Sequence, residues 1–188
     1  PFCGKKCDYC SFYSEPDAPQ ELVDSYCHSL LREIREYSAL YPDISAGTIY
    51  FGGGTPAMMG SLNFSRVISA IRDSFDCSGV SEITVETNPF STGEDFYETL
   101  LREGVTRITV GIQSFDDAVL NYLGRKSVSR EKIEKIFSLP FKSRCADLIC
   151  GVPGQTEISV ENEIRIISGL GAEHISCYIL SYDEGTPL

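Results

Sequence analysis

Three cysteines stand within the first ten residues, in the stretch PFCGKKCDYCSF. They are Cys3, Cys7 and Cys10, with the spacing Cys-x-x-x-Cys-x-x-Cys. Thiolates packed this closely can hold three irons of a four-iron, four-sulfur cluster. The fourth iron then has no protein ligand and is open to an exogenous one, which makes it a place for chemistry. The spacing therefore predicts a 4Fe–4S cofactor with these three cysteines as its metal ligands.

A structural zinc site is the alternative interpretation of the same cysteines. Such a site normally closes with four Cys or His ligands. The nearest unused candidates are Cys27 and His28, which lie well downstream on a predicted helix. The spacing and the number of ligands therefore favour the cluster.

The composition is that of an ordinary globular domain with a core, with 42% hydrophobic and 23% charged residues among 188. No segment resembles a signal peptide or a membrane span. The cysteines outside the motif follow no repeating frame, as expected for reduced thiols rather than a disulfide framework. They are Cys27, Cys77, Cys145, Cys150 and Cys177. A cytoplasmic protein is predicted.

The net charge of −11 argues against nucleic acid as a partner. A nucleic-acid backbone is bound by lysines and arginines that displace its counterions, and the sequence offers no such basic stripe.

Hydrophobic periodicity predicts helices that alternate with short apolar strands. A long amphipathic helix is expected at 20–41, with Leu22, Val23, Tyr26, Cys27 and Tyr37 among the residues of its apolar face. Strands are expected at 47–51, 82–86, 107–111, 144–150 and 174–180, and further helices at 64–75, 93–102, 116–123, 130–137 and 157–167. Capping boxes are expected at 91–94 and 114–117.

Alternating strands and helices imply a parallel sheet covered by helices, an α/β fold. The sheet is either open and doubly wound or part of a (β/α) barrel, and in both the ligand site lies at the carboxyl ends of the strands. Polar residues gather at these ends: FGGGTP follows one strand, and Glu86 and Gln113 close the next two. Asp147 lies within the following strand and shares a face with Cys145 and Ile149 by the period of two.

A carboxylate in a buried strand is costly unless it has partners. Capping of neighbouring loops could explain any one of Glu86, Gln113 and Asp147. Because all three occur at equivalent strand ends, they point to a single site.

Several motifs in order resemble one family across nearly the whole chain. They are PFCGKKCDYCSFYS, TIYFGGGTP, ITVETNP, ITVGIQSFDDAVLNYLGR, ADLICGVPGQT and ISCYILSYDEGTPL. The chain resembles the radical S-adenosylmethionine (SAM) enzymes related to oxygen-independent coproporphyrinogen III oxidase, and most of all the oxidase-like branch of heme chaperones. The resemblance implies a partial TIM-type (β/α) barrel, with residues 1–188 as a radical SAM core domain, and SAM chelating the open iron of the cluster.

The resemblance also implies roles for individual residues. Gly53, Gly54 and Thr55 would meet the methionine amino group, Arg125 its carboxylate, and Tyr9 the adenine. Glu86, Gln113 and Asp147 would hold the ribose and nearby polar atoms, and Ile149 and Ser181 match further adenosine-side positions. It assigns no catalytic residue.

Without the resemblance, several of these residues have plainer interpretations. The glycine run fits a tight strand-to-helix turn. Arg125 would be taken for a solvated surface charge, since arginine is mostly exposed. Tyr9 would be only a loop aromatic.

In the family, one electron from the reduced cluster cleaves the sulfonium of SAM to methionine and a 5′-deoxyadenosyl radical. In the oxidase, this radical removes a hydrogen from a propionate of coproporphyrinogen III, which loses carbon dioxide to become a vinyl group. The oxidase motif carries a further cysteine two residues after the third cluster ligand, where this chain has Phe12. Phe12 is instead like the chaperone branch.

Two functions follow from the resemblance. The first is a heme-binding chaperone, with heme as an additional ligand and a heme-acceptor protein as partner. The alternative is a true coproporphyrinogen III dehydrogenase of heme biosynthesis. Both imply a tetrapyrrole and a reductant such as flavodoxin or ferredoxin. An electron-transfer protein with an exposed cluster is a third option, which the matches at 53–55 and Arg125 disfavour.

Against the family pattern, the sequence reads as a fragment. The strand that leads into the cysteine loop would end just before Pro1, and the region after Leu188 that helps to define the second ligand would be missing. The first visible strand would then be a barrel edge, open to association.

Overall fold

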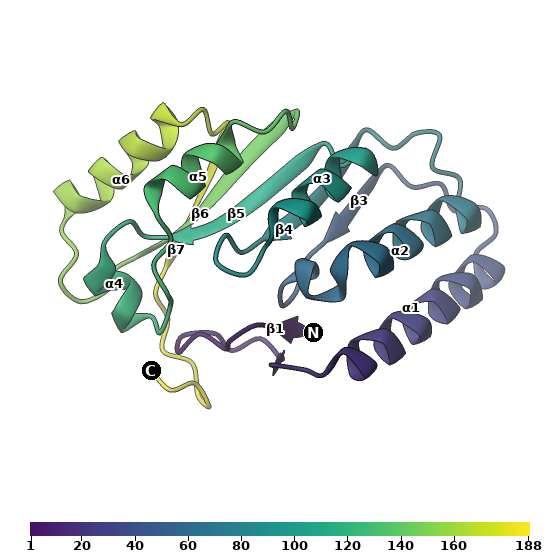
Figure 1. Ribbon diagram of the computed structural model, residues 1–188, viewed down its shortest axis with the longest axis horizontal. Helices are drawn as coiled ribbons and strands as arrows, with labels where there is room; N and C mark the ends of the chain where they lie inside the picture. The colour runs from purple at the N-terminus through teal and green to yellow at the C-terminus, as the bar shows by residue number, and fades with distance from the viewer.

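The computed structural model describes residues 1–188 as an α/β fold (Figure 1). Its strands are β1 (Phe2–Cys3), β2 (Glu15–Pro16), β3 (Thr48–Phe51), β4 (Glu82–Thr87), β5 (Arg107–Gln113), β6 (Ser143–Cys150) and β7 (His174–Ile179). Its helices are α1 (Gln20–Leu40), η1 (Pro56–Met59, a 3-10 helix), α2 (Gly60–Ser74), α3 (Glu94–Arg102), α4 (Asp117–Tyr122), α5 (Arg130–Phe137) and α6 (Glu157–Gly169). The predicted strands and helices are confirmed to within a few residues, whereas the short elements β1, β2 and η1 were not expected.

The main sheet is parallel and five-stranded, in the order β3-β4-β5-β6-β7. Its strands follow one another in chain order, without the reversal that defines a doubly wound sheet. The two edge strands do not pair with each other, so the sheet is an open, partial barrel and not a closed one. Of the two architectures expected from the alternation, the barrel type is confirmed.

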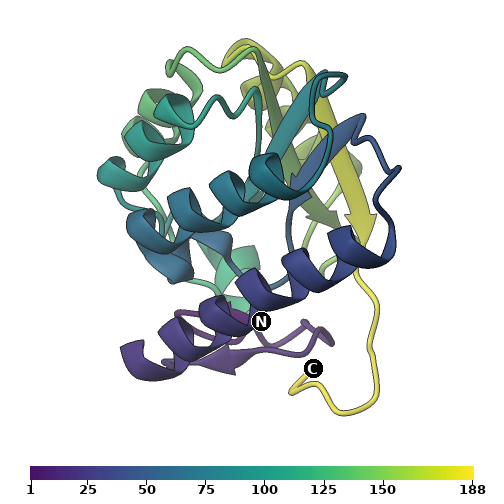
Figure 2. The same cartoon turned by 90° about the vertical axis from the view of Figure 1, so that its right-hand side faces the viewer.

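Helices cover one face of this sheet and build the core there. Buried side chains of β3 to β6 pack against α2, α3, α5 and α6, with Phe64, Leu100, Phe137 and Ile167 almost fully buried. The other face is lined by polar groups and by Tyr50, which is 60% exposed. Figure 2 shows the sheet from the side, with helices along one face. The open face is therefore free to hold a ligand.

The predicted apolar face of α1 is only partly buried. Val23 and Cys27 pack with Phe2 in a small separate cluster, and Cys27 lies in this core as expected. Leu22, Tyr26 and Tyr37 are exposed, against expectation. The reason is that α1 packs against α2 and η1 rather than on the sheet, so its neighbours cover only a narrow strip.

Both expected capping boxes are absent. Helix α3 begins after Gly93, which has no side chain to cap it, and α4 is capped by Asp116, whose carboxylate accepts from Ala118 N at 2.7 Å. A capping box occurs instead at the start of α6. Finally, none of the helices is long and apolar enough to cross a membrane.

Candidate functional site

A cavity of about 540 Å³ lies at the carboxyl ends of β3 to β7, beside the loop that carries the first three cysteines. Its volume is within the usual range for a small-molecule site. The predicted site residues that line it are Cys3, Cys7, Tyr9, Cys10, Gly53, Gly54, Thr55, Glu86, Gln113, Arg125, Asp147, Ile149 and Ser181. The fold therefore brings every one of them to one place, as the positions at strand ends indicated. Their individual binding roles stay predictions.

The cysteine loop joins β1 to β2, which pair with each other. Its three thiols are free and partly exposed, and the loop turns through a hydrogen bond from Cys10 N to Cys7 O at 3.1 Å. Thr55 Oγ1 lies 3.9 Å from Cys3 Sγ, which brings the glycine-rich loop to the first cysteine. Burial raises the pKa of the Cys10 thiol.

The nearest candidate for a fourth zinc ligand lies in a core cluster. Cys27 packs with Phe2 and Val23 there, and no group of three or more His, Cys, Asp or Glu side chains is arranged to hold a single metal ion. A four-iron cluster does not need thiols that converge on one point, because each cysteine binds a different iron. Three thiols spaced around one loop fit such a cluster.

The glycine-rich loop after β3 packs against the segment that leads into the cysteines. Thr55 N donates to Phe2 O at 2.7 Å, and a Cβ at Gly54 would lie only 2.4 Å from that same oxygen. Gly53 has a φ of 115°, a conformation that L side chains rarely adopt. Glycine is therefore required at both positions, for close approach at one and for the backbone angle at the other.

Glu86, near the end of β4, anchors the glycine-rich loop to the sheet. Its carboxylate accepts from Gly53 N at 3.2 Å and from the hydroxyl of Tyr50 at 2.7 Å. Burial, together with this hydrogen bond to Glu86, raises the pKa of Tyr50. Glu86 thus fixes the glycine loop at the edge of the cavity.

Arg125 lies in the cavity, although the sequence alone would have placed it on the surface. Its Nη2 donates to Gly111 O at 2.8 Å and to Asn88 Oδ1 at 3.2 Å. Its Nη1 lies 3.6 Å from Cys7 Sγ and 3.4 Å from the hydroxyl of Tyr9. Nη2 is held by normal hydrogen bonds, whereas the contacts of Nη1 are long. Nη1 is therefore the nitrogen that an anionic ligand could bind.

Tyr9 packs its ring against a small apolar cluster that includes Leu123 and Ile149. Burial raises the pKa of Tyr9 to about 12, although Arg125 opposes this shift. The phenol is therefore neutral at neutral pH. Ile149 itself is only 5% exposed, so it meets the cavity with little surface.

Asp147 has one carboxylate oxygen that lacks a hydrogen-bond partner. Its Oδ1 is buried and makes no hydrogen bond. Burial raises the pKa of Asp147, and the neighbouring Glu86 raises it further. The strand register sets Asp147 beside Gly111 of β5 and Ser176 of β7, on the open face of the sheet. A buried polar atom without a partner requires an explanation, and a ligand hydroxyl would supply the missing donor.

Gln113 has a strained backbone. Its φ is 68°, in the left-handed region, and the pairing of β5 with β6 shifts register between Gly111 and Gln113. A residue other than glycine in such a conformation costs of the order of 1–3 kcal/mol, and such strain clusters at functional sites. Gln113 is only 8% exposed.

The segment after β7 returns to the cysteine loop (Figure 2). Leu188 N donates to Asp8 O at 3.1 Å. Ser181 lies in this exposed segment, and its hydroxyl is 3.5 Å from Asp183 Oδ2. It therefore reaches the cavity from a loop rather than from the sheet.

The sequence reasoning did not assign Asn88, Thr109 or Lys5, which also line the cavity. Asn88 lies in the motif ITVETNP, and its side-chain oxygen accepts a hydrogen bond from Arg125. Thr109 shares a strand face with Gly111 by the period of two. Lys5 gave no sequence signal, because its contact is with a backbone oxygen, Gly124 O at 2.8 Å.

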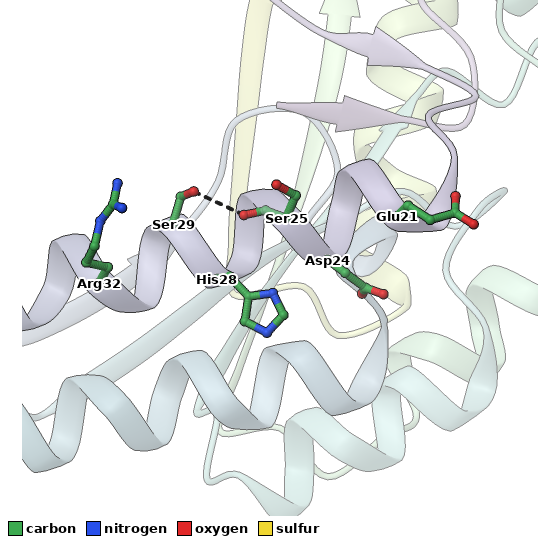
Figure 3. A pocket seen from close by; sticks show the side chains of 6 residues that line it. All are labelled: Glu21, Asp24, Ser25, His28, Ser29 and Arg32. Atoms are coloured by element: carbon green, nitrogen blue, oxygen red, sulfur yellow. Dashed lines mark hydrogen bonds between the residues drawn. The ribbon is translucent and has the colours of Figure 1, made fainter.

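A second hollow, of about 490 Å³, runs along α1 (Figure 3). It is lined by Glu21, Asp24, Ser25, His28, Ser29 and Arg32. All come from a single helix, none is apolar, and Asp24 already accepts from Asn63 of α2 at 2.8 Å. This hollow has the character of a solvated helix face, unlike the cavity at the strand ends, whose lining comes from several strands and several loops.

Comparison with known proteins agrees with this geometry. The family model for the radical SAM superfamily matches residues 1–167. The chain belongs to the radical SAM superfamily. This superfamily uses a 4Fe–4S cluster and SAM.

Within the superfamily, the similar proteins include heme chaperones and oxygen-independent coproporphyrinogen III oxidases. The chain is 30% identical to the heme chaperone HemW of Lactococcus lactis over 99% of its own length and 48% of that protein. It is 30% identical to the oxygen-independent coproporphyrinogen III oxidase of Salmonella typhimurium over 95% of its length and 40% of that protein. The structure of coproporphyrinogen III oxidase (HemN) from Escherichia coli matches with a TM-score of 0.89 and 26% identity, over 97% of this chain and 43% of that one. The chain thus spans about half or less of each relative.

Proposed function

We propose that Cys3, Cys7 and Cys10 bind the 4Fe–4S cluster and that the adjoining cavity binds SAM. The position of Arg125 carries this proposal. Its guanidinium stands next to Cys7 and Tyr9 of the cysteine loop, where Nη1 makes only long contacts, while Gly111 O holds Nη2. A rigid cationic fork at this point suits the methionine carboxylate.

The remaining groups suit the rest of SAM. The glycine loop leaves backbone carbonyls for the amino group, while its Gly53 amide is engaged by Glu86. Asp147 Oδ1 lacks a donor, and a ribose hydroxyl is one. Ile149 and Tyr9 provide apolar surface for the adenine.

When bound, the cluster and SAM supply one-electron cleavage of the sulfonium, a chemistry that no side chain offers. The chain itself binds and orients. Arg125 fixes one end of the ligand, Asp147 and Gln113 the other, and the buried walls of the cavity exclude water.

The test is SAM affinity after Arg125→Ala in the reconstituted protein. Loss of a hydrogen bond to a charged group costs about 1.5–3 kcal/mol, so affinity should fall roughly ten- to a hundredfold while iron content stays unchanged. Arg130→Ala is the matched control, because Arg130 is exposed and pairs only with Glu134, at 2.9 Å. Equal affinity in Arg125→Ala and the parent would remove the carboxylate assignment.

We further infer that the protein is a heme-binding chaperone, on the strength of its similarity to HemW and of Phe12. Phe12 stands where the oxidase has an additional cysteine, and it lines the cavity with 70% of its surface exposed. A tetrapyrrole is the ligand, with a heme-acceptor protein and a reductant such as flavodoxin or ferredoxin as partners. The thiols of the cluster motif require a reducing compartment, the cytoplasm.

Porphyrinogen oxidation is the second candidate, favoured by the likeness to HemN. Heme titration by absorbance and conversion of coproporphyrinogen III with SAM and reductant separate the two. Heme binding without a vinyl-bearing product supports the chaperone. Conversion without heme binding establishes the oxidase instead.

A further inference from the structure

Glu163 of α6 is a buried carboxylate that lies outside the cavity. It is only 7% exposed. Its Oε1 accepts a hydrogen bond from the hydroxyl of Ser114 and another from Phe115 N, at 2.9 Å. A carboxylate is buried at great cost unless such donors surround it. Glu163 therefore binds specifically to the turn between β5 and α4.

The hydroxyl of Ser114 extends this contact along the turn. While it donates to Glu163, it accepts from Asp116 N at 3.0 Å, and Asp116 caps α4. The Glu163 carboxylate thus holds Ser114 and Phe115 directly, and Asp116 through the hydroxyl of Ser114. Gln113 stands directly before this turn.

Gln113 needs such support. Its φ of 68° and the register shift beside it mean that β5 leaves the regular sheet here. A strained conformation persists only where the surroundings over-determine it. The side-chain amide of Gln113 folds back over Gly111, where an added Cβ would lie 3.0 Å from its Nε2. Gly111 O in turn accepts from Arg125 at 2.8 Å.

We propose that Glu163 is a positioning residue for SAM: through Ser114 and Phe115 it holds Gln113 in the strained conformation that presents its side chain to the cavity. This inference rests on the proposed function, that the cavity binds SAM. Glu163 itself touches no ligand. Its effect on binding passes through the backbone of the turn.

The experiment compares Glu163→Ala and Ser114→Ala with the parent in the reconstituted protein. Iron content, Tm, SAM affinity by equilibrium dialysis, and the electron paramagnetic resonance spectrum of the reduced cluster with and without SAM are measured. Both variants should keep their iron and their spectrum without SAM, and should bind SAM about tenfold more weakly, the factor that one net hydrogen bond produces. Glu163→Gln retains an acceptor and should recover most of the affinity.

Glu161→Gln is the matched control on the same helix. Glu161 is exposed and pairs only with Arg165, at 3.2 Å, so this variant should bind SAM as the parent does. If Glu163→Ala fails to fold, Ser114→Ala carries the test, because it removes only a hydroxyl.

A double variant distinguishes the positioning of Gln113 by Glu163 from a general loss of protein stability. In Gln113→Gly the side chain that Glu163 positions is gone, so adding Glu163→Ala should change the affinity by no more than about twofold. Parent-like affinity in folded Glu163→Ala and Ser114→Ala, or a tenfold loss that persists in the Gln113→Gly background, overturns the inference. Failure of the parent itself to bind SAM would instead overturn the proposed function.

Discussion

Arg125 Nη1 lies 3.6 Å from Cys7 Sγ, although 118 residues separate the two in the chain. The backbone around them is joined as well. Asp8 N donates to Leu123 O at 3.1 Å, and Lys5 Nζ donates to Gly124 O at 2.8 Å. The cysteine loop and the loop after α4 therefore form one hydrogen-bonded unit. A substitution in either loop should alter the conformation of the other.

Gly124→Ala should disrupt this unit. Gly124 has a φ of 67°, and a Cβ there would lie 2.4 Å from the carboxyl group of Asp8. The backbone strain alone should lower the free energy of unfolding by about 1–3 kcal/mol. Because Arg125 is the next residue, SAM affinity should fall too. Chemical denaturation and equilibrium dialysis measure the two effects.

Gly169→Ala is the control for that substitution. Gly169 ends α6, and a Cβ there meets nothing within 4 Å. Alanine should stabilise the protein by about 0.4–1 kcal/mol, because it restricts the unfolded chain. Were Gly124→Ala to be as stable as Gly169→Ala, neither the positive φ of Gly124 nor its close contact with Asp8 would matter.

Replacing Cys3, Cys7 or Cys10 individually with alanine should abolish the cluster. Three ligands are the minimum that leaves one iron open, so the loss of any one leaves two irons without a protein ligand. Iron and sulfide analysis after anaerobic reconstitution is the measurement. Cys77→Ala should retain the cluster, because Cys77 packs beside the core and its Sγ donates to Ile71 O, at 3.9 Å. A cluster that survives Cys7→Ala but is lost in Cys77→Ala would show that the ligands are misassigned.

The sequence predicted those features of the site that depend on local pattern. The period of two placed Asp147 on the same face as Ile149, and the alternation of strands and helices placed Glu86 and Gln113 at one edge of the sheet. The register of the sheet confirms this arrangement. Local pattern decides these features because a strand fixes the direction of its own side chains.

The sequence did not predict the features that depend on contacts between residues far apart in the chain. Ser114 was expected to cap α4, but its hydroxyl binds Glu163, 49 residues away. Glu163 stands in a helix rich in charged residues, where nothing local marks it as buried. Arg125 was assigned through the family resemblance alone, since only the folded chain brings it to Cys7. The exposure of Tyr26 and Tyr37 likewise depends on which elements cover α1.

Asp147→Asn should stabilise the protein at neutral pH and weaken SAM binding. Burial raises the pKa of Asp147, with Glu86 adding to the shift and Ser176, His174 and Arg107 opposing it. The folded state then holds this proton to a higher pH than the unfolded chain. Stability therefore falls as pH rises from the ordinary aspartate pKa of about 3.9 through the raised value, and stays lower above it.

The asparagine variant has no such proton to lose. Its gain in unfolding free energy over the parent should be present at pH 7 and vanish near pH 3, below both pKa values, in denaturation curves across this range. Asp43→Asn, at an exposed position, is the control for the loss of one aspartate. A gain that is equally large at pH 3 would mean that packing, not ionisation, is responsible.

Phe12→Ala should weaken heme binding while leaving the cluster and SAM affinity intact. Phe12 is 70% exposed at the rim of the cavity, on the cysteine loop but not among its ligands. An aromatic ring that a tetrapyrrole covers on binding contributes about 1.5–3 kcal/mol through burial, or roughly ten- to a hundredfold in affinity. Leu40→Ala is the matched control, since Leu40 is equally exposed, at 70%, but ends α1 away from the cavity. Absorbance titration with heme measures both. If both variants bind heme as the parent does, heme lies elsewhere on the protein. If heme affinity falls equally in both variants, heme binds exposed apolar side chains without selectivity. Only a loss of affinity confined to Phe12→Ala supports a tetrapyrrole at the mouth of the SAM cavity.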